Sequence, residues 1–81
     1  MTDTAELKAR NAIAKALKCA PGAVDADASV ETLAQWDSIG HVNIILEVEG
    51  DLGRPLLPEE IAGISSFVDV VLIYQRHQAS A

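Results

Sequence analysis

The chain has 81 residues, of which 49% are apolar and only 4% are aromatic, and its formal net charge is −6. This length suits one small domain, residues 1–81, with little room for a deep substrate cleft beside its core, so we expect no enzyme. Residues 21–70 contain ten acidic side chains and one arginine, which argues against nucleic-acid binding because neutralising phosphates requires a basic surface. A basic protein partner would complement this acidic middle, although such runs are more often a solvated face.

The cysteine content and the N-terminal residues bear on the cellular compartment. The single cysteine, Cys19, excludes an internal disulfide, and it is not spaced with His41 or His77 as metal ligands are. The N-terminal residues MTDTAELKAR lack a basic start followed by an apolar run, and no apolar run is long enough to span a bilayer. We therefore expect a cytoplasmic protein without membrane insertion.

The first predicted element is a helix over about residues 4–18. Asp3 stands three residues before Glu6, which is a helix-start pattern, and apolar residues, mostly alanines, recur through the segment. Pro21 and Gly22 are expected to end this helix.

Residues 20–37, APGAVDADASVETLAQWD, predict a long loop with at most one helical turn around 30–34, because no helical period is sustained. A loop of this length in so small a domain must be fixed to the helices by apolar side chains. We expect four such anchors, which are Val24, Val30, Leu33 and Trp36.

The second helix is predicted over residues 38–51, with Asp37 or Ser38 as its N-cap and Gly53 and Pro55 closing it. Its apolar residues form two ridges. The core-facing ridge contains Ile44, Ile45, Val48 and Leu52, and the other contains Ile39, Val42 and Leu46. One helix in so small a domain can hardly bury both, so either the second ridge is an exposed contact site or both ridges lie under the long loop.

Two further helices are predicted in the C-terminal third. PEEIAG, residues 58–63, is a short helix with Pro58 at its first position. The last helix covers residues 66–77, begins with Ser66 and Asp69 as a capping pair, and is expected to fray in QRHQASA. The predicted fold class is therefore all-α, with three longer helices and one short one.

The stretch WDSIGHVN, residues 36–43, concentrates the residues with chemical potential. Ser38 has no G-x-S-x-G elbow around it, and although a hydrogen bond to His41 is geometrically possible, no third group is placed to orient the histidine. Asp37, His41 and Glu49 do not have the spacing of a metal site. Capping is the local interpretation of Ser38, and the same helix start would also favour a phosphate on its hydroxyl.

Gly40 is an unusual residue inside the first turn of a helix. It costs about 1 kcal/mol of helix stability relative to alanine. Something other than helix stability must favour it, and the close approach of another group is one such reason.

Several landmarks resemble the acyl carrier protein family, which includes aminoacyl and peptidyl carriers. Residues 37–39, Asp-Ser-Ile, resemble the attachment site at the head of that family's second helix, and residues 36–41 resemble the form W-D-S-L-G-H of many discrete carriers. EGDLG, residues 49–53, resembles the close of the same helix, and ISSFVD, residues 64–69, resembles the opening of the last one. The landmarks occur in order, without a gap, over nearly the whole chain.

The resemblance implies an acyl-carrier-like bundle in which Ser38 carries a 4′-phosphopantetheine arm. A phosphopantetheinyl transferase would attach the arm from coenzyme A, and its thiol would hold an acyl, aminoacyl or polyketide cargo as a thioester. Asp37 would contact the transferase through a magnesium ion at that enzyme's site. Enzymes that load and transfer the cargo would dock on the second helix, at Ile39, Val42, Leu46 and Glu47. We expect such a carrier to be a monomer.

The chain also departs from the family pattern. Carriers of fatty-acid synthesis usually have acidic residues in the first turns of this helix, whereas this chain has Gly40, His41 and Asn43, and its acids begin at Glu47. The departure indicates a dedicated carrier of one specialised pathway. The alternative is a helical interaction module that has the carrier fold and does not use the arm. The aliphatic side chains could line a cavity for the cargo or pack it shut.

Overall fold

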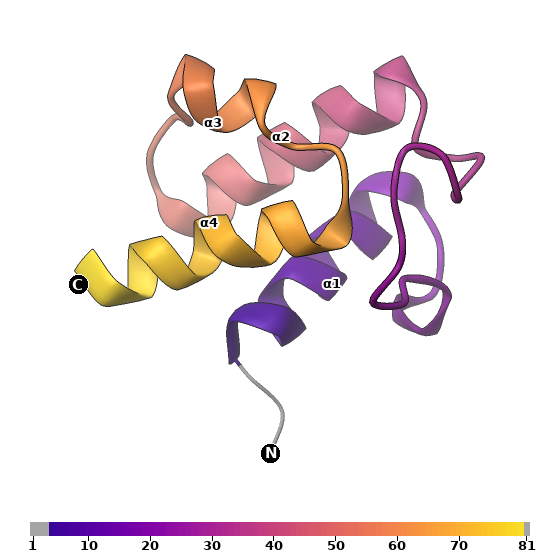
Figure 1. The fold of residues 1–81 in the computed structure, drawn as a ribbon, viewed down its shortest axis with the longest axis horizontal. Coiled ribbons are helices and arrows are strands. Elements are labelled where there is room, and N and C mark those ends of the chain that lie inside the picture. The colour runs from indigo at the N-terminus through magenta and orange to yellow at the C-terminus, as the bar shows by residue number, and fades with distance from the viewer. Residues whose placement is uncertain (1–3, 81) are drawn as a thin grey trace.

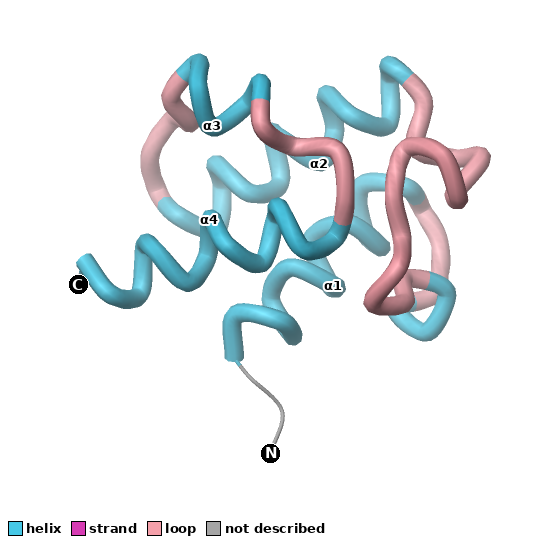
Figure 2. Tube along the Cα trace, in the orientation of Figure 1, coloured by secondary structure: helices cyan, strands magenta, loops and turns pink. Residues whose placement is uncertain are grey.

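The chain folds into four α-helices in the computed structural model, which describes residues 4–80. The elements in order are α1 (Thr4–Leu17), the 3₁₀ turn η1 (Pro21–Ala23), α2 (Ser38–Leu52), α3 (Pro58–Ala62) and α4 (Phe67–Ser80) (Figure 1). Within the described residues there is no strand, only an isolated antiparallel bridge between Ser29 and Ser66. The predicted all-α class is confirmed, and the long loop joins α1 to α2 (Figure 2).

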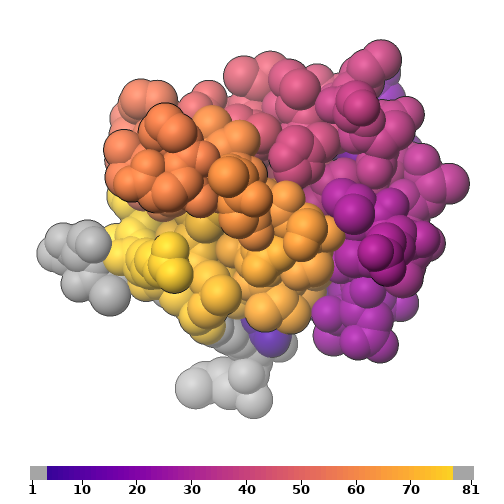
Figure 3. All heavy atoms as spheres, turned by 45° about the horizontal axis from the view of Figure 1, so that its top comes forward, coloured from indigo at the N-terminus to yellow at the C-terminus, as the bar shows by residue number. Residues whose placement is uncertain are grey.

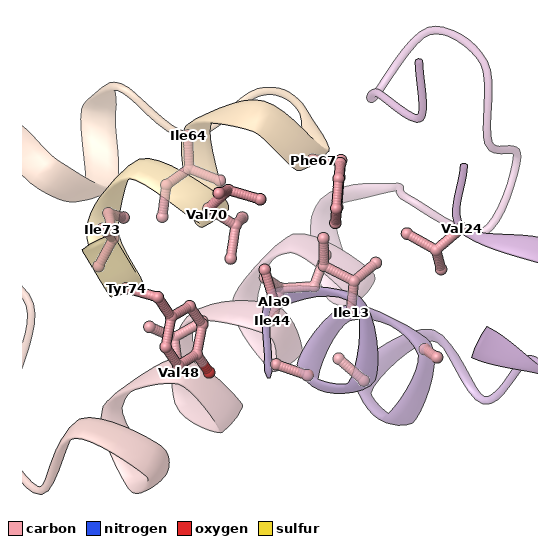
Figure 4. Close-up of a cluster of buried hydrophobic side chains, with 14 of the residues drawn as sticks. Ala9, Ile13, Val24, Ile44, Val48, Ile64, Phe67, Val70, Ile73 and Tyr74 are labelled. Atoms are coloured by element: carbon pink, nitrogen blue, oxygen red, sulfur yellow. The ribbon is translucent and has the colours of Figure 1, made fainter. Parts of the chain in front are cut away.

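Helix α1 packs against both α2 and α4. Much of its packed face consists of alanines, which are Ala5, Ala9, Ala12, Ala14 and Ala16. Such small side chains allow close approach of the neighbouring helices, and the larger Ile13 fills the space beside Ile44 of α2 (Figure 4). Burying a branched side chain of this size contributes about 1.5–3 kcal/mol, so α1 holds the other two helices together mainly by apolar burial.

The contact between α2 and α4 contains one polar group in an otherwise apolar core. Ile44 and Val48 of α2 and Val70 and Tyr74 of α4 are fully buried (Figure 4). The Tyr74 hydroxyl donates a 2.6 Å hydrogen bond to Asp51 Oδ2 at the edge of this core. Burial and the neighbouring carboxylate of Asp51 raise the pKa of Tyr74, so the hydroxyl keeps its proton and remains a donor.

Helix α1 ends by a different device from the predicted one. Lys18 has a left-handed backbone with φ of 58°, and the Cys19 N–H donates to the Ala14 carbonyl at 2.9 Å. This is a Schellman ending with lysine in the position that usually holds glycine. The helix therefore stops at Leu17, and the prediction that Pro21 and Gly22 end it is wrong, since these two residues begin η1 instead.

The long loop is fixed to the helices by three of the four predicted anchors. Val24 and Trp36 are buried, and Leu33 packs against the core while partly exposed. The prediction is wrong for Val30, which is 44% exposed, and Ala28 is buried instead.

Main-chain hydrogen bonds also hold the loop against the start of α4. The Phe67 N–H donates to the Ala28 carbonyl at 2.9 Å, and the Val30 N–H donates to the Ser65 carbonyl at 3.0 Å. The chain then makes one turn, in which the Thr32 and Leu33 N–H groups both donate to the Ser29 carbonyl, so the single turn predicted near residues 30–34 is present without a regular helix.

The remaining helix boundaries are close to the predicted ones. Helix α2 ends at Leu52, where Gly53 takes a φ of 72° and donates its N–H to the Glu49 carbonyl. Helix α3 ends one residue before the predicted end. Helix α4 continues to Ser80, three residues beyond its predicted end at residue 77. Asp3, the predicted start signal of the first helix, lies outside the described residues.

Candidate functional site

Asp37, and not Ser38, is the N-cap of α2. Its Oδ1 accepts a 2.8 Å hydrogen bond from the Gly40 N–H, which is the ordinary capping geometry. Ser38 is the first helical residue and its side chain is exposed. Within the part of the chain that the structure describes, no hydrogen bond engages the Ser38 hydroxyl. The aspartate therefore caps the helix, and the Ser38 hydroxyl is left exposed at its first position.

Gly40 is required because the chain itself approaches it closely. A Cβ at this position would overlap the Gln35 carbonyl oxygen and lie 2.7 Å from Leu17 Cδ2. The expectation of close approach is confirmed, and the approaching groups belong to the loop and to the end of α1. Residue 40 thus packs α2 against the rest of the fold, so its lack of an acidic side chain has a structural cause.

Trp36 joins the loop to α2 through the neighbouring histidine. The indole is buried, and its Nε1–H donates to His41 Nδ1 at 3.1 Å. The half-buried His41 is therefore engaged by Trp36 rather than by Ser38, and the Ser38 to His41 hydrogen bond that the spacing permits is not formed. An activated serine would need that bond, so the structure offers Ser38 no general base from this side chain.

An open pocket lies beside Ser38, where the loop meets the first turn of α2. Its volume is about 430 Å³, and the residues that line it are Val30, Trp36, Asp37, Ser38 and His41. The loop that contributes to this pocket is coloured purple to magenta in Figure 3, where it forms the right-hand side of the molecule. The exposed Val30, which failed as a core anchor, contributes apolar surface to the pocket.

The second ridge of α2 is exposed. Ile39, Val42 and Leu46 are 73%, 53% and 58% exposed, so the possibility that the loop covers both ridges is wrong. Ser38 stands at the N-terminal end of the same helix as this ridge.

The acidic residues of α2 serve contacts within the chain. Glu47 lies 3.7 Å from Lys15 Nζ of α1, and a Glu49 carboxylate oxygen accepts the Leu56 N–H at 2.8 Å. Asp51 accepts the Tyr74 hydroxyl, as described above. Glu47 therefore forms an ion pair with α1, and its predicted contact with partner enzymes stays a prediction.

Among the described residues, no three His, Cys, Asp or Glu side chains cluster in a way that could hold a metal ion. None of the helices in residues 4–80 has the length and apolarity to cross a membrane. No protein-family model and no curated protein matches the chain. The geometry around Ser38 is therefore the basis for inferring a function.

Proposed function

We propose that this chain is a carrier protein of the acyl-carrier type, with a 4′-phosphopantetheine arm on Ser38. The observation that carries the proposal is the exposed Ser38 hydroxyl at the first position of α2, which no described residue engages and which lies beside an open pocket. The arrangement of three longer helices, one short helix and a long first loop agrees with the carrier fold. The partners would be cytoplasmic enzymes that load and transfer the cargo in one specialised pathway.

Ser38 supplies the attachment point and its neighbours supply the setting. Its Oγ would form a bond to the phosphorus next to the pantetheine of coenzyme A, while the pyrophosphate bond breaks and adenosine 3′,5′-bisphosphate leaves. The transferase would accept the hydroxyl proton, because no base among the described residues engages Ser38. The first turn of α2 favours the negative phosphodiester through its N–H groups and positive helix end. When attached, the arm supplies a thiol that holds the cargo as a thioester.

Asp37 and the exposed ridge would serve the partners. Only Oδ1 of Asp37 is used by the cap, so its other carboxylate oxygen can face a magnesium ion of the transferase. Ile39, Val42 and Leu46 would contact the loading and transferring enzymes through apolar surface. Contacts of this modest size suit fast release, which a carrier that visits several enzymes requires.

The test is arm attachment in solution. The protein is incubated with coenzyme A and a transferase of broad specificity, and its intact mass is measured. The wild type and Ser65→Ala, which removes another exposed serine, should each gain one arm, whereas Ser38→Ala should gain nothing. An unmodified wild type with two different transferases would overturn the proposal.

A second candidate function is a protein-interaction module that does not use the arm. The exposed ridge of α2 favours it, because docking on that ridge does not require a modified serine. This candidate predicts that a partner binds Ser38→Ala as tightly as the wild type, and that protein from its native source lacks an arm. Gly40 and His41 no longer support it, since both are used inside the fold.

A further inference from the structure

The hydrogen bond from Trp36 fixes the tautomer of His41. An indole nitrogen can only donate, so the His41 Nδ1 that faces it must offer a lone pair. A neutral imidazole then carries its proton on Nε2. His41 consequently presents a donor on the side of its ring that Trp36 does not occupy.

That histidine belongs to the pocket beside Ser38. The two residues are three apart on α2, which places their Cβ atoms about 5–6 Å from each other on one face of the helix. Both line the 430 Å³ pocket, together with the exposed apolar side chain of Val30. The pocket thus combines one polar donor near the serine with apolar surface from the loop.

The proximal half of the 4′-phosphopantetheine arm matches this pocket, because it has a polar group next to the serine and an apolar group beyond it. In the arm, a phosphodiester includes the serine oxygen, and a methylene group and then a carbon with two methyl groups follow it. The volume of the pocket lies within the range of about 300–1,000 Å³ that is usual for small-molecule sites. The pocket can therefore take the phosphate at its polar side and the methyl groups at its apolar side.

We infer that this pocket is a resting seat for the proximal half of the Ser38-linked arm, with His41 as the positioning residue. The inference rests on the proposed function. The Nε2–H of His41 donates to a phosphodiester oxygen, and Val30 packs against the geminal methyl groups. Trp36 holds the imidazole in the required tautomer and orientation, in the way that an outer hydrogen-bond partner orients a functional histidine.

The primary test is NMR of the wild-type protein carrying the arm, with the same protein before attachment as reference. We expect nuclear Overhauser contacts between the geminal methyl groups of the arm and the Val30 methyl groups. The His41 Nε2 resonance should shift on attachment while the Trp36 indole N–H signal stays in place. An arm without contacts to Val30, or an unchanged His41 resonance, overturns the inference.

Two substitutions of His41 separate positioning of the phosphate from support of the fold. In His41→Asn the amide oxygen can replace Nδ1 and still accept from Trp36, but no donor reaches the phosphate. In His41→Gln the amide N–H₂ replaces the Nε2–H donor. We expect the ³¹P shift and the Val30 contacts to change in the Asn variant and to return toward wild type in the Gln variant. Asn43→Ala, on the same helix outside the pocket, should leave both unchanged.

The outcomes distinguish this inference from the proposed function. If intact mass shows no arm on the wild type, the proposed function fails. If the arm is present but equal ³¹P shifts are found in wild type and both His41 variants, only the resting seat fails. A change in the Gln variant together with wild-type ³¹P shifts in the Asn variant would assign His41 a structural role through its bond to Trp36, and would also overturn the inference.

Discussion

Two helices of this fold begin with serine and aspartate in opposite order. Before α4, Ser65 and Ser66 precede Asp69, whose carboxylate accepts hydrogen bonds from both serine hydroxyls, each at 3.0 Å. At α2 the aspartate comes first, so Asp37 caps the helix and the adjacent Ser38 hydroxyl stays exposed and unengaged within the described residues. The order of the two residue types decides whether a serine hydroxyl stabilises the chain or is available to another molecule.

The largest expected loss of stability comes from a substitution in the first turn of α2. Gly40→Ala places a Cβ against the Gln35 carbonyl and the Leu17 side chain, and the main chain cannot yield cheaply. We expect a loss of about 1–3 kcal/mol in the free energy of unfolding, measured by urea denaturation. Gly50→Ala is the matched control, since nothing lies near its added methyl group, and it should gain about 0.4–1 kcal/mol. Equal effects of the two substitutions would contradict the packing role of Gly40.

Removing the two aspartates compares the helix starts directly. Asp69 accepts from the Ser65 N–H and two hydroxyls, whereas Asp37 accepts from the Gly40 N–H. We expect Asp69→Ala to cost about 2 kcal/mol and Asp37→Ala about 1 kcal/mol in the free energy of unfolding. Thermal and urea unfolding of both variants would check the ranking, and a greater loss for Asp37→Ala would refute it.

Acid should weaken the start of α4. Burial of the Asp69 carboxyl works to raise its pKa, but hydrogen bonds from Ser65 and Ser66 outweigh it, and the pKa of Asp69 lies below its ordinary value. A lowered folded-state pKa adds stability that is complete above the unfolded value of about 3.9 and is lost as the pH falls through the folded one. The stability gap between wild type and Asp69→Ala should therefore narrow below about pH 4. A gap that stays constant from pH 7 to pH 3 would contradict this assignment.

The smallest effects concern the serines. Ser66→Ala removes the hydroxyl that accepts the Asp69 N–H and donates to its carboxylate, so we expect a loss of about 1 kcal/mol in the free energy of unfolding. Ser38→Ala removes a hydroxyl without a partner in the described chain and should change that free energy by less than about 0.5 kcal/mol. A large loss from Ser38→Ala would show that this serine is needed for folding and would weaken the contrast.

The elements of the fold could be predicted from local patterns, and their ends less well. Helical periodicity and capping residues predicted where α2 and α4 begin, and Gly53 predicted where α2 ends. The end of α1 was predicted to within one residue, but its Schellman ending was not, because Lys18 adopts a backbone conformation that lysine rarely takes. Val30 was misplaced because its exposure depends on main-chain pairing with residue 65, which is distant in sequence.

The candidate site was predictable in its residues and not in their roles. Ser38 and Asp37 stood out as a helix start, but the sequence left open which of them caps it. The hydrogen bond from Trp36 to His41 joins a loop residue to a residue of α2, and neither helical nor strand spacing predicts it. A buried indole needs an acceptor for its N–H, so the isolated tryptophan beside a histidine was the available signal.

The most direct test of the account is the intact mass of this protein purified from its own cells, followed by fragmentation of the peptide that contains Ser38. The account predicts a mass increase of one 4′-phosphopantetheine arm, with or without cargo, located on Ser38 and absent from Ser65 and Ser66. An unmodified Ser38 in the native protein, or an arm on another serine, would contradict it.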